Sequence, residues 1–254
     1  MRRLIRSLFA LAALCLALTA GLAKGQGANY VVGVEDLDYF PIYAMRDKEY
    51  VGAARDILDA FAKYAGIRFT YVPMPITRLT SELVNASVDF KFPDNAYWLA
   101  DLRKGKTIAY SQAVIAYIDG VMVLPEKKGR PLAQFSTLGT VTGFTPFAWQ
   151  STLKEGRVRL IENPQMRALQ KQVLAGRIDG AYASVAVANH LLEKDLKQPG
   201  ALVFDASLPH TRSDYYLSSA KHPELIKRFD TWLKANAARV SAIKNKHGAE
   251  AGVN

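Results

Sequence analysis

The amino-acid sequence predicts an α/β fold made of two units of similar size. Short apolar runs typical of buried strands alternate with longer segments whose apolar residues have helical spacing. This alternation begins again after residue 120, and the last strand and helix are available to return to the first unit. Strands separated by helices of this length favour parallel pairing, because parallel neighbours need a long crossover.

The first unit begins with an apolar run rich in β-branched residues. Ile57 and Phe61 then recur at helical spacing in a segment that Gly66 ends. Pro73 closes the following strand, because proline cannot donate to a strand ladder. The expected elements are a strand at 30–34, a helix at 54–64, a strand at 67–72, a helix at 76–85, a strand at 88–92 and an apolar stretch at 114–118.

The second unit follows Asp119 and Gly120, where we expect a strand to leave the first unit and enter the second. Gly176 ends a helix within it, as glycine commonly does. The expected elements are an apolar stretch at 121–124, strands at 138–141, 158–161, 178–183, 201–204 and 215–218, and helices at 147–154, 166–174, 185–194 and 224–237.

The amino terminus has the layout of a secretory signal peptide. Arg2, Arg3 and Arg6 form a basic start, and an apolar run at 8–20 precedes small residues. The run is shorter than the roughly 20 residues that a membrane-spanning helix needs. We therefore expect a signal peptide at 1–23 that is cleaved on export to the periplasm, with a retained membrane tether as the alternative.

The only cysteine, Cys15, lies within that apolar run. Leu14 before it is larger than the residue a lipoprotein signal prefers, so cleavage without lipidation is the favoured interpretation. The mature chain then has no thiol. Disulfides, cysteine nucleophiles and thiolate metal sites are excluded together.

The chain is basic, with a formal charge of +10, of which the three signal-peptide arginines contribute a part. Such an excess can indicate nucleic acid, an anionic membrane surface or an anionic ligand. The basic residues are scattered and form no long block, and export removes the chain from nucleic acid. We expect a solvated basic surface and no nucleic-acid partner, with an anionic ligand left open.

Enzymatic motifs are weak. Residues 105–107 imitate the end of a phosphate-binding loop, but Ala100 stands where the motif requires glycine. The histidines have no metal-binding spacing, and neither a nucleophile elbow nor a dinucleotide fingerprint occurs. The sequence predicts no enzyme, no cofactor and no metal. Asp94 beside Lys91 could act as an acid or base, so a lyase or hydrolase is the minor alternative.

Several short motifs, in order over most of the mature chain, carry a family resemblance. Between residues 30 and 237 the chain resembles the extracellular solute-binding proteins of family 3, the polar amino-acid type of the type II periplasmic binding fold. The matching segments are 31–41, 51–57, 83–89, 110–111, 174–180 and 221–225.

The resemblance implies two lobes joined by a two-segment hinge that closes around a small molecule in the cleft. Lobe 1 would comprise 28–117 and 212–254, and lobe 2 would comprise 118–211, with crossings near 116–119 and 206–214. A monomer that delivers a polar solute to an inner-membrane ABC permease is the implied function. A ligand-dependent partner of a membrane sensor is the alternative.

Open α/β sheets bind ligands at the carboxyl ends of their strands, so the loops there supply candidate ligand-binding residues. Asp36, Tyr39 and Phe40 offer aromatic faces beside a carboxylate, although Tyr39 and Phe40 could instead fill the core. Arg78 could grip a carboxylate or phosphate, or could be an ordinary exposed arginine.

Two further positions depart from the amino-acid binders that the chain resembles. The family has a threonine and an arginine after the third strand, and this chain has Asp94 and Asn95 there, which we take as ligand contacts. Ser184 stands where the family places the aspartate that binds the ligand's α-ammonium group. A standard zwitterionic amino acid is therefore a poorer expectation than the family implies.

The loop 142–145 follows a predicted strand and precedes a predicted helix. Its backbone donors would lie at the positive end of that helix, which suits an anionic or carbonyl group. Capping of the helix by Thr145 is a compatible alternative. The candidate ligand-binding residues of this loop are Thr142, Gly143, Phe144 and Thr145.

Overall fold

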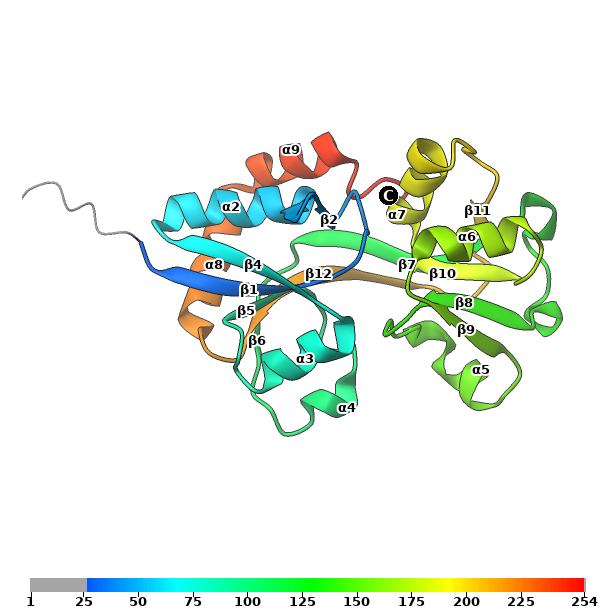
Figure 1. Ribbon diagram of the computed structural model, residues 1–254, viewed down its shortest axis with the longest axis horizontal. Coiled ribbons are helices and arrows are strands. Elements are labelled where there is room, and N and C mark those ends of the chain that lie inside the picture. Colours follow the sequence, from blue (N-terminus) through cyan, green and yellow to red (C-terminus); the bar gives the residue numbers. More distant parts are fainter. Residues whose placement is uncertain (1–26, 254) are drawn as a thin grey trace, which may run out of the picture.

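A computed structural model of the protein describes residues 27–253, and the predicted signal peptide lies outside them. Two α/β lobes stand side by side and are joined by two long strands, as Figure 1 shows. This arrangement confirms the predicted fold class. Within residues 27–253, no helix has both the length and the apolar character needed to cross a bilayer.

One twisted sheet runs through both lobes. Its first three strands pair in parallel, as predicted from their helical crossovers, and so do β10, β8 and β9 at the other end. The sheet order is β4 (Arg68–Met74), β1 (Asn29–Glu35), β5 (Phe90–Asp94), β12 (Thr211–Ser219), β7 (Ile115–Val123), β10 (Gly180–Ser184), β8 (Thr137–Val141) and β9 (Arg159–Asn163). Short strands complete the set: β6 (Ala109–Tyr110), β11 (Val203–Phe204), and a hairpin of β2 (Ala44–Arg46) and β3 (Glu49–Val51).

The antiparallel strands β7 and β12 form the hinge, because each belongs to both lobes. They pair with each other from Thr211 opposite Asp119 to Tyr215 opposite Ile115. Beyond that stretch β12 pairs with β5, and β7 pairs with β10. The two apolar stretches expected around Asp119 are therefore one continuous strand. The second crossing strand, β12, begins at Thr211, within the range of 206–214 where the second crossing was expected.

Helices cover both faces of the sheet in each lobe (Figure 1). In the first lobe α2 and α9 lie above the sheet in this view and α3 and α4 below it; in the second, α6 and α7 lie above and α5 below. The helices are α2 (Ala53–Ala65), α3 (Ile76–Val84), α4 (Ala100–Arg103), α5 (Gln150–Lys154), α6 (Met166–Leu174), α7 (Val185–His190), α8 (Pro223–Ala235) and α9 (Ala237–His247).

Two predicted helices differ in detail. The helix expected at 147–154 is a 3₁₀ turn at Phe147–Trp149 followed by the single-turn α5. The helix expected at 185–194 changes to a π-helical turn, Leu191–Asp195, after α7. Helix α9 was not predicted, because only Val240 within it is buried and its sequence lacks a strong apolar period.

The chain after α9 returns to the hinge. Val253 packs against Ile118 of β7 and Val185 of the second lobe. The guanidinium of Arg212 donates to the carbonyl of Val253 at 2.7 Å, and Glu250 accepts from the amide of Ala116 at 2.8 Å. This C-terminal tail therefore contacts both hinge strands and the second lobe.

The loop between β1 and β2 is held against the start of α2. Gly52 precedes this helix with a φ of 112° and a ψ of −176°, a conformation that only glycine adopts readily. A Cβ at this position would lie 2.7 Å from the carbonyl oxygen of Ile42. Because the same loop carries Tyr39 and Tyr43, the close approach at Gly52 helps to fix their positions.

We predict that Gly52→Ala lowers the free energy of unfolding by about 2–6 kcal/mol, since it adds backbone strain and a steric overlap. Gly105→Ala is the matched control, because Gly105 also has a positive φ but a Cβ added there would meet no atom within 4 Å. This control should lower the free energy of unfolding by about 1–2 kcal/mol. Urea denaturation of both variants measures this difference, and equal losses would contradict the steric account.

Candidate functional site

A small cavity lies between the lobes, beside the hinge. Lobe 1, lobe 2 and both hinge strands all contribute to its wall. Its volume is about 20 Å³, room for roughly one water molecule. Pockets that hold small-molecule ligands are usually about 300–1,000 Å³. The lobes are therefore in contact across the cleft, and a larger molecule requires them to move apart.

Aromatic rings form most of the apolar wall of the cavity. Tyr39 and Tyr43 come from the loop after β1, Trp98 from the loop after β5, and Tyr215 from hinge strand β12. Phe144 approaches from the second lobe, with its ring centroid 5.3 Å from that of Tyr39 in an edge-to-face contact. The wall thus presents aromatic faces from both lobes to one small space.

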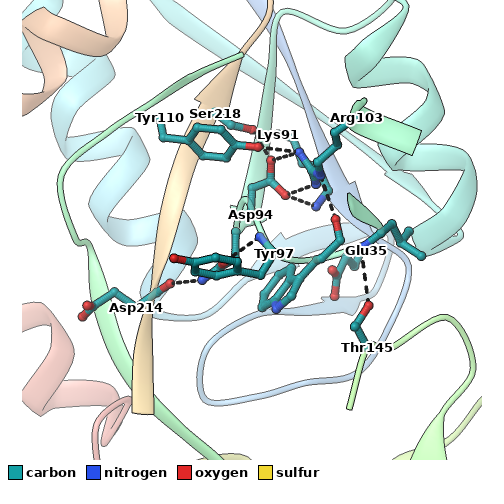
Figure 2. A network of polar contacts seen from close by, with 12 residues as sticks. Glu35, Lys91, Asp94, Tyr97, Arg103, Tyr110, Thr145, Asp214 and Ser218 are labelled. Carbon is teal, nitrogen blue, oxygen red and sulfur yellow. Dashed lines mark hydrogen bonds and ion pairs between the residues drawn. The ribbon is translucent and has the colours of Figure 1, made fainter. Parts of the chain in front are cut away.

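Two hydrogen bonds join the lobes at the cavity. The amide of Ser184 donates to the hydroxyl of Tyr39 at 2.8 Å. The amide of Leu99 donates to the hydroxyl of Thr145 at 3.4 Å, as the dashed line to Thr145 in Figure 2 shows. Tyr39 therefore packs in the core and lines the cavity at the same time, and its contact with a ligand stays a prediction.

Three charged side chains also line the cavity. They are Glu35 at the end of β1, Lys91 in β5 and Asp119 in β7, and all three are buried. Burial raises the pKa of Glu35 above its usual value, although the ammonium of Lys91 and the hydroxyl of Tyr43 act in the opposite direction. Burial, assisted by the charge of Glu35, raises the pKa of Asp119 to about 8.

Behind the cavity, Asp94 is the centre of a buried polar network (Figure 2). Its carboxylate accepts from Lys91 at 2.6 Å, from Ser218 at 2.6 Å and from both terminal nitrogens of Arg103 at 3.0 and 2.6 Å. Burial alone would raise the pKa of Asp94, but Lys91 and Arg103 together hold it below its usual value. Arg103 also donates to the carbonyl of Trp98 at 2.7 Å. The network therefore positions Lys91 and Trp98, which line the cavity.

The structure brings four of the predicted ligand-binding residues to the cavity, namely Tyr39, Gly143, Phe144 and Thr145. The remaining predicted residues lie elsewhere: Asp36, Phe40, Arg78, Asp94, Asn95, Thr142 and Ser184 do not line it. Their positions give each a different role.

Three of these lie on the surface or at the rim of the cleft. Asp36 borders a separate, open groove between the lobes. The ring of Phe40 packs against His190 at 4.9 Å between centroids. Arg78 is exposed and pairs with Glu82 on its own helix at 3.4 Å.

Asp94, Asn95 and Ser184 are buried. Both oxygens of Asp94 are occupied by the network described above. The side-chain amide of Asn95 donates to the Ser213 hydroxyl at 3.1 Å and to the Asp214 carbonyl at 3.2 Å, so it holds β12 in place. The hydroxyl of Ser184 has no hydrogen-bond partner among residues 27–253.

The loop at 142–145 differs from its prediction. No long helix follows it, and Thr145 does not cap the 3₁₀ turn. The amide of Gly143 donates to the carboxylate of Glu162 at 3.2 Å, while Thr142 is exposed. The acidic side chain of Glu162 therefore already accepts from this backbone donor, and the helix end expected beside the loop is absent.

Glu35, Lys91 and Asp119 were not predicted as lining residues. Each carries a charge at the end of, or inside, an otherwise apolar strand. Charged residues are rarely buried unless they are paired or functional, so this pattern is the signal that could have identified them.

Comparison with known proteins finds structural relatives only. No protein-family model and no curated protein sequence matches the chain. The arginine-, lysine-, histidine-binding protein ArtJ from Geobacillus stearothermophilus superposes with a TM-score of 0.68 at 21% identity, over 86% of this chain and 94% of that chain.

Two other solved structures are similar. An arginine transport-system periplasmic binding protein from Legionella pneumophila has a TM-score of 0.70 at 14% identity, over 87% of this chain and all of that one (100%). An ABC uptake transporter substrate-binding protein from Streptococcus pneumoniae with bound histidine has a TM-score of 0.68 at 20% identity, over 86% of this chain and 92% of that chain. The chain therefore has the two-lobed fold of the periplasmic amino-acid-binding proteins that its sequence resembles.

We predict that Asp94→Ala lowers the free energy of unfolding by about 3–5 kcal/mol, because it leaves Lys91 and Arg103 buried without their shared anion. Arg78→Ala, which breaks the exposed ion pair with Glu82, is the control and should change the free energy of unfolding by less than about 0.5 kcal/mol. Chemical denaturation followed by circular dichroism measures both. A loss at Asp94 no larger than that at Arg78 would show that the network does not stabilise the fold.

Proposed function

We propose that this chain is a periplasmic solute-binding protein that captures a small polar molecule by closing its two lobes. The observation that carries the proposal is the cavity wall, to which both lobes and both hinge strands contribute. A ligand held there contacts all the parts that move relative to one another. Its binding energy therefore favours the closed arrangement over open ones.

The hinge geometry supports closure as a rotation about two strands. We place lobe 1 at 28–117 and 212–254 and lobe 2 at 118–211. The contacts of Tyr39 with Ser184 and Phe144 join these lobes. Opening breaks a few such contacts, and a bound ligand adds others that the open form lacks.

Delivery to an inner-membrane ABC permease is the partner function we propose. The amino-terminal signal predicts export, and the structural relatives include a transport-system periplasmic binding protein and an ABC transporter substrate-binding protein. A membrane sensor is the alternative recipient, and pull-down with detergent-solubilised inner membrane separates the two.

Binding without turnover is favoured over catalysis. Asp94, the carboxylate that the sequence suggested as an acid or base, is held by Lys91, Arg103 and Ser218 behind the cavity. Both of its oxygens accept hydrogen bonds within this network, so it has no free route to a substrate in the cleft. We therefore propose a receptor rather than a lyase or hydrolase.

The first test is to identify the small molecule that copurifies with the protein, using mass spectrometry of the denatured sample. Adding that molecule back should raise the melting temperature, since it binds the folded form; at 100 times Kd the gain is about 2.7 kcal/mol. If nothing copurifies and a broad metabolite set produces no melting shift, the receptor function is wrong.

A second prediction concerns the cavity wall. Tyr39→Phe removes a hydroxyl that lines the cavity, where it can bond a ligand or the amide of Ser184, and a buried hydrogen bond contributes roughly 1 kcal/mol. We expect the affinity for the copurified ligand to fall about fivefold to tenfold by isothermal titration calorimetry. Arg78→Ala, at an exposed side chain that does not line the cavity, should bind as the unchanged protein does; equal affinity in all three proteins would contradict this role of Tyr39.

A further inference from the structure

Asp119 carries a buried carboxyl oxygen without a partner. The residue is 8% exposed, and its Oδ1 atom makes no hydrogen bond with any of residues 27–253. It lies in hinge strand β7 and lines the cavity between the lobes. A buried carboxyl group without a partner is costly, so the position calls for a group that supplies a hydrogen-bond donor.

Other oxygen atoms that can accept a hydrogen bond lie in or next to the same space. Glu35 lines the cavity from β1, and Thr80 lines it from α3 with a hydroxyl, able to donate or accept, that has no partner among the described residues. Ser184 lies opposite Asp119 in the β7–β10 register, which puts both side chains on one face of the sheet, and its hydroxyl is likewise without a partner there. The deep part of the cleft is therefore rich in acceptors.

The charges around the cavity do not balance. Lys91 and Arg103 supply two positive charges, and Asp94 binds both of them directly. When ionised, Asp94, Glu35 and Asp119 supply three negative charges. The cluster thus lacks one positive charge, which a ligand bearing a single cationic group would provide at the cavity.

The aromatic wall suits the same ligand group. The rings of Tyr39, Tyr43, Trp98, Phe144 and Tyr215 line the cavity. Aromatic faces attract cations, and desolvated sites gain more from this attraction than exposed ones. An anionic group would instead face two carboxyls and the negative faces of these rings, and the cation in the wall, Lys91, is already paired with Asp94.

We propose that the ligand carries a protonated amine, and that this ammonium group binds deep in the cleft to Asp119 and Glu35 within the aromatic wall. The inference rests on the proposed receptor function and adds the chemical class of its ligand. It replaces the anionic option that the basic composition left open.

The proposal implies a proton exchange at Asp119. With its pKa near 8, this carboxyl is mostly protonated at pH 6 to 7 in the unliganded protein. An ammonium ligand favours the ionised form, so binding below pH 8 releases a proton to the buffer. Affinity should rise by up to tenfold per pH unit between pH 6 and 8 and level off above that. An anionic or neutral acceptor ligand would bind the protonated carboxyl and show the opposite slope.

Several titratable groups face Asp119 and bear on this pH dependence. Burial raises the pKa values of the surrounding tyrosines, so they stay neutral throughout this pH range. The groups are Glu35 on β1, Lys91 on β5, Tyr39 on the loop after β1, Tyr117 on β7, Tyr182 on β10 and Tyr215 on β12. Glu35 is the other carboxyl that can change charge, which gives the experiment a second variant.

The experiment compares cadaverine and L-lysine with glutarate, a dianion of similar length, by calorimetry at pH 6, 7 and 8. We expect the two amines to bind more tightly at pH 8 than at pH 6 by at least tenfold, and glutarate not to bind. Repeating the pH 7 titration in buffers of different ionisation enthalpy should show release of up to one proton per amine bound.

Two substitutions test which carboxyl causes the pH dependence of amine binding. Asp119→Asn should weaken amine binding at least tenfold at pH 8 and remove the pH dependence, whereas Glu35→Gln should weaken binding and retain it. Asp101→Asn, an exposed carboxylate on α4, is the control and should behave as the unchanged protein. Asp119→Asn replaces a carboxyl that is mostly protonated at pH 7 in the unliganded protein with an amide of similar size, so the melting temperature without ligand should change little. If it does fall, Asp119→Ser is the second variant.

Three outcomes would overturn the proposal: no melting shift or heat with either amine at 20 mM, tighter glutarate binding than amine binding, or amine affinity unchanged by Asp119→Asn. A copurified ligand without an amine, bound with a melting shift, would reject this ligand class and leave the receptor function intact. Absence of any bound or binding molecule would instead reject the receptor function itself.

Discussion

The carboxylate of Asp94 is the interaction on which the site depends. It ties β5 to β12 through Ser218, and it ties both strands to the segment after β5 through Arg103. Buried ion pairs seldom add net stability, because desolvation offsets the attraction between the charges. Their value here is positional, since the network fixes Lys91 and Trp98 at the edge of the cavity. The charged groups nearest the cleft are thereby kept in a defined arrangement.

This arrangement pairs both cations with one carboxylate. Lys91 lines the cavity and Arg103 lies behind it, and both are paired with Asp94, whereas the carboxyls of Glu35 and Asp119 face the cavity with raised pKa values. The basic composition of the whole chain is therefore a poor guide to the character of the cleft. Overall charge describes the solvated surface, whereas the local partners of each buried group determine what the cleft can bind.

Periodicity predicted the strands of both lobes because their apolar residues face a buried core. It missed α9, which buries little, but it located the crossing at Asp119, where β7 passes from one lobe to the other. The rule that ligands bind after strand ends led to Tyr39 and to the loop 143–145. It could not separate Asp94 from Asp119, because both are buried aspartates. Only the tertiary structure shows that Asp94 is paired with Lys91 and Arg103, whereas Oδ1 of Asp119 has no hydrogen-bond partner among residues 27–253.

The tail that follows α9 has a consequence for motion. Because it is bonded to Ala116 and Arg212 and inserts Val253 beside Val185, it acts as a third link across the two hinge strands. A hinge of two strands alone can both bend and twist. With a third attachment on one side, a twist of one lobe relative to the other would break the contacts of the tail, whereas bending about an axis near the tail would disturb them little. The lobes should therefore open and close by rotation about a single hinge axis.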